Sequence, residues 1–404
     1  MFLLFQQDIK LSMINEAGYS KATALLHKAS TPLGFVASVN DHDNYKRVWT
    51  RDGVVSGLAA LLSGDTNLIE TFESTLKTIF DHQHAVGFMP SNVSPDGKVS
   101  YGGTVGRADN PAWAVVGICH YVLTTNHTHF GEKYKHHVEK CLALMEAWEF
   151  NGKHLVYVPQ SGDWADEYIQ HGYVLFDQLL RVWALRLAAR VYARIEWHHK
   201  ANEIVKVIQK NFWNYNLEKD LYSPNLKHQR KGAPTRFWFL GFNPARIYHQ
   251  FDLQANSLAL LLGISDEQQA KSVINFIADL ADHFQSILPS YFPSIENQDW
   301  EMKELENNFA YTFRNTPHEF HNGGLWPVWN GLLAAMLARQ KEVNLAQKIT
   351  AYIHEANACH DWELNECLHG QTKQPIGVAY CTWSASGAVI AEKCVENKDA
   401  QLIF

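Results

Sequence analysis

Residues 54–80 read VVSGLAALLSGDTNLIETFESTLKTIF, and this stretch decides the expected fold because it joins two helical patterns through a very short turn. In the second pattern, apolar residues recur at the spacing of an amphipathic helix, at Leu68, Phe72, Leu76 and Ile79. In the turn, Gly64 is typical of a helix C-cap and Asp65 of an N-cap. Two helices joined so closely run antiparallel, so the stretch predicts a helical hairpin.

The same arrangement recurs along the chain. The turn GISDEQ at 263–268 follows another apolar run, and its Ser265 and Gln268 are expected to form a capping box. Together these patterns predict twelve helices in six pairs, at 8–29, 52–63, 67–82, 111–125, 131–150, 174–193, 196–213, 251–262, 266–284, 327–339, 342–357 and 382–393. Long irregular segments separate the pairs, at 30–51, 83–110, 151–173, 214–250, 285–326 and 358–381.

The alternation of short turns and long loops indicates how the helices are arranged. Long loops in a compact domain are usually functional. If each long loop leads into an inner helix and each short turn leads to an outer one, all six long loops lie at one end of a closed double ring. We therefore predict an all-α fold, a single (α/α)6-barrel domain over residues 1–404 with one site at the loop face. Closure of the ring is an inference, because the number of helices does not by itself set their curvature.

Composition restricts the possible partners. Hydrophobic residues make up 46% of the 404 and charged residues 19%, which is typical of a folded globular chain, and the net charge of −7 does not favour nucleic acid. No apolar run is as long as a membrane span, and the first ten residues lack the features of a signal peptide. Six cysteines without CxxC spacing suggest reduced thiols. We expect a cytoplasmic protein that binds a small molecule and binds neither nucleic acid nor a membrane. A homo-oligomer is compatible with this composition.

The long loops combine acidic or amide residues with aromatic rings. Five such clusters precede expected inner helices, and a sixth lies further upstream: NYKRVWTRDG (44–53), GRADNPAW (106–113), SGDWADEY (161–168), YHQFDLQAN (248–256), NTPHEFHNGGLWPVW (315–329) and HDWELNECLHG (360–370). This mixture suits a sugar, whose hydroxyl groups take polar contacts while its C–H face stacks on a ring. Helix capping would equally explain Asp52 and Asp252, and Trp329 is expected in the core.

Two kinds of sugar chemistry remain open from the residues alone. Hydrolysis needs one carboxylic acid and one carboxylate on opposite sides of the sugar, and composition does not choose among Asp163, Asp166, Glu167, Glu319, Glu363 and Glu366. Isomerisation or epimerisation would instead use histidines as proton shuttles, with His249, His321, His360 and His369 available. The HEFH segment at 318–321 lacks the HExxH spacing of a metal pair, and no phosphate- or dinucleotide-binding motif is present, so neither a metal nor an organic cofactor is expected.

As an ordered series, these loops resemble the alkaline and neutral invertases, family 100 of the glycoside hydrolases. The segment WTRDGVVSGLAALLSGDTNLIETFESTLK (49–77) is similar to the Arg-Asp opening of that family and the helix pair behind it. NTPHEFHNGGLWPV (315–328) resembles its Asn-x-Pro…His-Asn-(Ala/Gly)-Gly-x-Trp-Pro-Val signature, and TWSASG (382–387) its Thr-Trp-x-x-x-Gly. The correspondence runs in order from about residue 44 to residue 393.

The resemblance implies roles for particular residues. Asp166 would be the general acid and Glu366 the general base of an inverting hydrolase that cleaves a small sugar such as sucrose, with Trp164 as a wall beside the acid. The two carboxyl groups of such an enzyme stand roughly 6.5–9.5 Å apart. The implied substrate-binding residues are Arg51, Asp52, Asp109, Trp113, Trp164, His321, Asn322, Trp326 and Trp383.

Two features depart from the family pattern. The loop that holds Glu366 is two residues longer after Trp362, so Glu363 remains a rival base. Glu167 and Tyr168 follow the acid where the invertases carry a basic pair, which implies a different sugar on the leaving-group side. Related (α/α)6 glycosidases that act on α-glucosides and α-mannosides, including debranching-type enzymes, share the Arg-Asp and His-Asn-Gly segments and remain alternatives.

Overall fold

The computed structural model describes residues 2–214, 221–396 and 402–404. Within these ranges, twelve long helices occupy the predicted positions: α1 (Phe2–Ala29), α2 (Thr50–Ser63), α3 (Thr66–Asp81), α4 (Asn110–Thr125), α5 (Thr128–Ala147), α6 (Leu175–Val191), α7 (Ile195–Asn211), α9 (Leu253–Leu261), α10 (Glu267–Phe284), α12 (Pro327–Arg339), α13 (Val343–Asn357) and α15 (Thr382–Glu396). The described loops also contain short helices that were not predicted: α8 (Leu226–Gln229), α11 (Met302–Glu306) and α14 (Cys359–Trp362).

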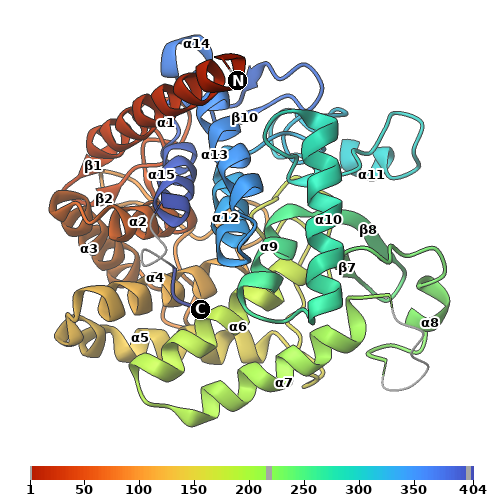
Figure 1. Cartoon of the computed structure of the whole chain (residues 1–404). Helices are drawn as coiled ribbons and strands as arrows, with labels where there is room; N and C mark the ends of the chain where they lie inside the picture. The colour runs from red at the N-terminus through yellow and green to blue at the C-terminus, as the bar shows by residue number, and fades with distance from the viewer. Residues whose placement is uncertain (1, 215–220, 397–401) are drawn as a thin grey trace.

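The inner helices form a closed ring, which confirms the predicted (α/α)6 barrel. Around the ring, α2 contacts α4, α4 contacts α6, α6 contacts α9, α9 contacts α12, α12 contacts α15, and α15 returns to α2. The second helix of each hairpin packs outside the ring, and α1, α3, α5 and α7 lie at the periphery in Figure 1. Because α1 packs against α15, the two ends of the helical sequence together supply the sixth pair.

Burial explains why the outer helices gave the clearer sequence pattern. Helix α3 buries one apolar stripe that includes Phe72 and Leu76, as an amphipathic helix does. By contrast, α4 is buried at every residue from 110 to 122, since its neighbours in the ring and an outer helix enclose it. Helix α4 therefore carries little periodicity in its sequence.

The helix caps agree with the sequence at one turn and differ by one residue at another. Gly64 ends α2 in the left-handed conformation at φ 71°, and the Asp65 side chain accepts a hydrogen bond from the Leu68 amide, as predicted. The predicted capping box at Ser265 and Gln268 is wrong, because Asp266 and Gln269 form it. The Ser265 hydroxyl instead accepts a hydrogen bond from the Trp238 indole at 2.8 Å.

Short antiparallel strands hold the long loops together. One sheet has the order β6 (Tyr173–Val174), β7 (Phe239–Phe242), β8 (Ile247–Asp252) and β9 (Tyr291–Phe292), and a second has the order β3 (Val48–Trp49), β4 (Asn92–Val93) and β5 (Val99–Ser100). Two strand pairs complete the set: β1 (Ser30–Thr31) with β2 (Gly34–Phe35), and β10 (Cys367–Leu368) with β11 (Pro375–Ile376). Strands β3, β6 and β8 lead directly into α2, α6 and α9, so they fix where these inner helices begin.

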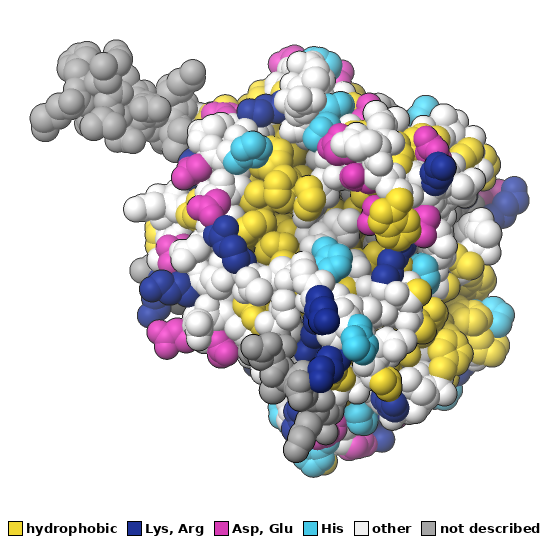
Figure 2. Space-filling view, turned by 90° about the vertical axis from the view of Figure 1, so that its right-hand side faces the viewer, with side chains coloured by type: hydrophobic (Ala, Val, Ile, Leu, Met, Phe, Trp, Pro, Cys, Tyr) yellow, Lys and Arg dark blue, Asp and Glu magenta, His cyan; other side chains and the backbone are white. Residues whose placement is uncertain are grey.

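The surface over α8, α10 and α11 is chemically mixed. Figure 2 shows acidic, basic and histidine side chains interspersed with apolar ones on this face, without a continuous field of one charge. Among the described residues, no helix combines the length and the apolar character needed to cross a membrane.

Candidate active site

The third long loop places three carboxylates in three different settings. Asp163 is 2% exposed and accepts hydrogen bonds from the Ala165 amide and, at 3.0 Å, from the Gln170 side chain. Burial raises the pKa of Asp163 to about 7. Glu167 lies at the rim, where its carboxylate accepts a hydrogen bond from the Ala310 amide at 3.2 Å. Asp163 therefore supports the loop from inside, and Glu167 joins it to the fifth loop.

Asp166 is the carboxylate of this loop that is open to solvent and held by a cation. Its side chain is 39% exposed, and Nη2 of Arg107 lies 2.5 Å from its Oδ2. The other terminal nitrogen of Arg107 donates to the Ser161 carbonyl at 2.8 Å, so the guanidinium is fixed at both ends. Arg107 is a functional candidate that the sequence reasoning did not select, although it lies in the GRADNPAW cluster. Its place in that cluster, close to Asp109 in the sequence, was the available signal.

Trp164 does not form an isolated wall, because it belongs to a buried aromatic cluster. Its ring centroid lies 5.0 Å from that of Trp329, 5.1 Å from His321, 5.4 Å from Trp326 and 6.5 Å from Trp383. His321 stacks flat on Trp326. Within the described residues, no hydrogen-bond partner is found for Nδ1 of His321 or for the indole nitrogens of Trp164, Trp329 and Trp383. The cluster thus retains unused polar atoms among its rings.

Burial sets the charge of His321. It lowers the pKa of His321 to about 4, so the imidazole is neutral near pH 7. A neutral imidazole offers one donor and one acceptor, which suits a hydroxyl group better than it suits an anion.

The first and second loops meet at a buried ion pair. Nε of Arg51 lies 2.7 Å from Oδ2 of Asp109, and both side chains are buried. Asp52 lies within α2 and does not act as its N-cap, and burial raises the pKa of Asp52 to about 6. Trp113 is 3% exposed and packs against Phe176 and Trp183 of α6, so its ring lies in the core.

Glu366 occupies a closed setting in the sixth loop. It is 6% exposed, and the Tyr45 hydroxyl lies 2.9 and 3.0 Å from its two carboxylate oxygens. The Val378 amide donates to Oε2 at 3.4 Å. Burial raises the pKa of Glu366 to about 7, against the lowering effect of the Tyr45 hydrogen bond.

The rival base is placed differently. Glu363 has a side chain that is 33% exposed and lies 3.5 Å from His360 at the outside of the loop. The Glu366 side chain is also closely packed, since Gly377 has φ +74° and a Cβ there would lie 2.6 Å from Oε2 of Glu366. The geometry therefore favours Glu366 over Glu363 as a base in an enclosed site.

The Asn322 side chain makes hydrogen bonds within the fifth loop, which contains it. Its side chain accepts from the Ile295 amide at 2.6 Å and donates to the carbonyls of Ile295 and Asn315 at 2.8 and 3.2 Å. The Asn315 side chain in turn donates to the Glu167 carbonyl at 3.1 Å. These bonds fix the fifth loop beside the third and engage both the oxygen and the nitrogen of the Asn322 amide.

Contacts link five of the six loops to one another, through Arg51–Asp109, Arg107–Asp166, Trp164–His321 and Tyr45–Glu366. The charges of Asp52, Asp109 and Asp166 all act on Arg51, that of Asp166 acts on His321, and that of Asp52 acts on Glu366. The fourth loop contributes support, because buried Asp252 is the N-cap of α9 and accepts from the Ala255 amide at 2.7 Å. The capping explanation is thus confirmed for Asp252.

Known proteins similar to this chain include plant invertases. A family model described as alkaline and neutral invertase matches residues 231–398. The mitochondrial alkaline/neutral invertase C of Arabidopsis thaliana is 23% identical, over 94% of this chain and 67% of its own. Cytosolic invertase 1 of Oryza sativa subsp. japonica is 21% identical, over 95% of this chain and 78% of its own. The resemblance seen in the sequence is confirmed. The chain is an invertase-like glycoside hydrolase.

Solved structures with the same fold are also glycosidases. A family 63 mannosylglycerate hydrolase from Thermus thermophilus has a TM-score of 0.66 at 13% identity, and the match covers 92% of this chain and 99% of that one. A bacterial glucoamylase complexed with acarbose has a TM-score of 0.62 at 16% identity, covering 95% and 56% of the two chains. At these identities the likeness shows that the invertase-like chain shares their fold.

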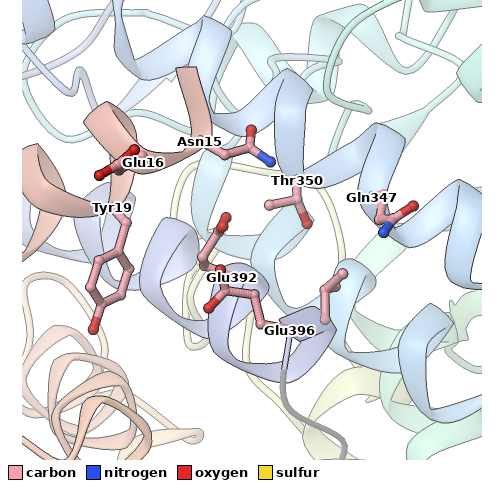
Figure 3. Close-up of a pocket in the computed structure, with 8 residues that line it drawn as sticks. Asn15, Glu16, Tyr19, Gln347, Thr350, Glu392 and Glu396 are labelled. Atoms are coloured by element: carbon pink, nitrogen blue, oxygen red, sulfur yellow. The ribbon is translucent and has the colours of Figure 1, made fainter. Parts of the chain in front are cut away.

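This invertase-like enzyme has a cavity away from the candidate catalytic residues. The cavity, of about 480 Å³, lies among α1, α13 and α15, and Figure 3 shows Glu16, Glu392 and Glu396 around it. Glu392 is already paired with the buried His354, at 2.9 Å. Since none of the candidate catalytic residues lines it, we do not assign it to the sugar chemistry. Among the described residues, no group of three His, Cys, Asp or Glu side chains is placed to hold a metal ion.

Proposed function

We propose that this enzyme is an inverting hydrolase of sucrose or of a similarly small α-glucoside-type sugar. The observation that carries the proposal is the pair of carboxyl groups on separate loops of one site. Asp166 is open and held by Arg107, whereas Glu366 is enclosed and held by Tyr45. An inverting glycosidase needs two carboxyl groups in different roles, one to protonate the departing oxygen and one to activate water.

The proposed reaction follows from these two settings. Asp166 gives its proton to the glycosidic oxygen as the bond to the anomeric carbon breaks. Glu366 in its ionised form takes a proton from the water that attacks the anomeric carbon from the opposite side. The pKa of about 7 makes Glu366 a competent base near neutral pH. Asp166 regains its proton from solvent, to which its side chain is open.

The remaining residues divide into ligands and supports. We propose that Arg51, Asp52, Asp109 and His321 bind hydroxyl groups of the cleaved sugar. Their supply of donors and acceptors suits this role. The rings of Trp164, Trp326 and Trp383 would shape the same subsite. We assign a supporting role to Asn322, whose amide holds the fifth loop, and to Trp113, whose ring packs in the core.

The similar proteins support a sugar substrate but leave its identity to experiment. The names of the curated relatives favour sucrose, whereas the fold neighbours act on mannosylglycerate or are glucoamylases. We therefore keep other small α-glucosides and α-mannosides as the alternative. We also propose that residues 1–404 act as one catalytic domain and that the enzyme works in the cytoplasm, as the name of one rice relative suggests for that protein. The free state of all six cysteines supports this location.

The proposal is tested with the purified chain and a panel of sucrose, α-glucosides and α-mannosides. Products are identified by mass, and the anomer formed first is followed by NMR. Cleavage of sucrose alone, with inversion, supports the invertase activity. Cleavage of another sugar with inversion keeps the two carboxyl groups and reassigns the substrate. Conversion without addition of water contradicts hydrolysis and favours an isomerase that uses histidines.

Variants of the third loop test the assigned acid. Asp166→Asn removes the proton donor but keeps the shape, so kcat should fall by about 10³-fold or more without loss of folding. Glu167→Gln is the matched control on the next residue, and its kcat should stay within a few-fold. Normal turnover by Asp166→Asn would exclude this residue as the acid.

A further inference from the structure

An aromatic groove shares Arg107 with the proposed acid, Asp166, and is not used by the reaction as described. It has a volume of about 640 Å³, within the range of small-molecule sites. Its residues come from the second long loop, from the C-cap of α5 at Trp148 and from the third long loop that follows it. The lining consists of Phe88, Met89, Tyr101, Gly102, Gly103, Thr104, Val105, Gly106, Arg107, Ala108, Trp148, Phe150, Tyr157 and Pro159.

Two pairs of rings form walls of the groove. Phe88 stacks on Trp148 with centroids 6.2 Å apart and planes inclined by 17°. Phe150 meets Tyr157 edge to face at 6.4 Å. Phe88 is 37% exposed and Phe150 is 78% exposed, so both rings present apolar surface to solvent. Apolar rings that line one concave surface are typical of small-molecule binding sites.

The chemistry of the groove differs from that of the candidate sugar site. Among the described residues that line it, none is an Asp, Glu, Asn or Gln, and Arg107 is the one charged residue. A sugar ring needs several polar partners for its hydroxyl groups, whereas a flat apolar ring needs faces to stack on. The groove therefore suits an aromatic ring better than a second sugar.

The position of the groove relates it to the leaving group. Arg107 lines the groove and also lies 2.5 Å from Asp166. The general acid of a glycosidase stands beside the oxygen of the leaving group, so the surface next to the acid faces the part of the substrate that departs. Glycines at 102, 103 and 106 keep side chains out of this rim, and Gly102 has φ +125°, which other residues rarely adopt.

We propose that the groove binds an aromatic aglycone, so that aryl glycosides are a substrate class of this enzyme. This inference rests on the proposed function for its link to hydrolysis. The reaction balances as any glycoside hydrolysis does: the bond between the anomeric carbon and the aryl oxygen breaks, Asp166 protonates that oxygen to give the phenol, and water supplies the hydroxyl group of the sugar. No oxidant or further reactant is needed.

Binding of 2-naphthol, a free aglycone, tests the site without requiring turnover. Calorimetry on the full chain should show binding to the wild type, and Phe88→Ala/Phe150→Ala should weaken it about tenfold or more. Trp300→Ala is the matched control, because Trp300 is an aromatic residue 62% exposed outside the groove. It should bind 2-naphthol as the wild type does. Absent binding, or equal loss in the control, overturns the proposal.

Kinetics then test the assignment to the leaving-group side. The selectivity of the wild type for 2-naphthyl α-glucoside over methyl α-glucoside should fall about tenfold in Phe88→Ala/Phe150→Ala, mainly through the KM of the naphthyl substrate. Unchanged selectivity overturns the proposal. A double variant that changes the molecular mass in light scattering also overturns it, because the groove would then be a contact between copies. If no glycoside is cleaved but 2-naphthol binds as expected, the hydrolase function fails while the aromatic site is supported.

Discussion

The two proposed catalytic carboxyl groups lie in opposite environments on the two sides of the candidate site. On the third loop, Asp166 is 39% exposed and its partner is the cation of Arg107. On the sixth loop, Glu366 is 6% exposed and its partners are the neutral Tyr45 hydroxyl and a backbone amide. The difference in burial separates the two carboxyl groups, and the proposed assignment of the acid to Asp166 and of the base to Glu366 follows the resemblance to the invertases.

The largest effect should come from removing the enclosed carboxylate. Glu366→Gln keeps the shape and one oxygen but removes the base, so kcat should fall by about 10³-fold to 10⁴-fold. Glu363→Gln is the matched control from the same loop and should change kcat by less than about tenfold. Steady-state kinetics on the best substrate of the panel, with circular dichroism to check folding, measures both. A larger loss of kcat in Glu363→Gln than in Glu366→Gln would make Glu363 the base and would remove the contrast between the two sides.

The Glu366→Gln substitution should also stabilise the fold at high pH. The pKa of Glu366 is raised from 4.5 to about 7, which means that the folded state binds this proton more tightly than the unfolded chain. Its contribution to stability is therefore present at low pH and is lost as pH rises from about 4.5 to 7. Above pH 7 the ionised buried carboxylate destabilises the fold by about 3 kcal/mol, and a neutral glutamine carries no such penalty.

Urea denaturation at pH 5 and pH 8 measures this cost. Glu366→Gln should gain about 2 to 3 kcal/mol relative to the wild type between the two pH values. Asp166→Asn serves as the comparison from the open side. An equal gain there, or none for Glu366→Gln, would contradict the difference in burial.

Sequence predicted the ring better than it predicted the site. Caps and apolar spacing are local, so a turn such as Gly64–Asp65 could be recognised without the fold. The choice between Asp163 and Asp166 was not local, because it depends on Gln170 on one side and Arg107 on the other. Short strands at the loop face also escaped prediction, since two-residue pairings carry almost no pattern of their own.

Tyr45 offers a way to shift the base without removing it. Its hydroxyl hydrogen bond lowers the pKa of Glu366, so Tyr45→Phe should raise that pKa further. The rising limb of kcat/KM against pH should then move upward by about one pH unit. Tyr192→Phe is the control, because its hydroxyl donates to the Gly131 carbonyl in the helical core. A limb that stays in place, or moves equally in the control, would remove Tyr45 from the role of positioning Glu366.

The same substitution, serine to alanine, can be made once on the open side of the site and once on the enclosed side. The Ser161 hydroxyl bonds the Asn308 side chain at 2.7 Å in a partly exposed position, whereas the fully buried Ser384 donates to the Asn365 carbonyl at 2.8 Å. Removing a hydroxyl from the open side lets water replace it, so Ser161→Ala should cost at most about 0.5 kcal/mol. Ser384→Ala leaves a buried carbonyl short of a donor and should cost about 1 to 2 kcal/mol. Chemical denaturation measures both, and equal costs would mean that burial does not distinguish the loop of the acid from the loop of the base.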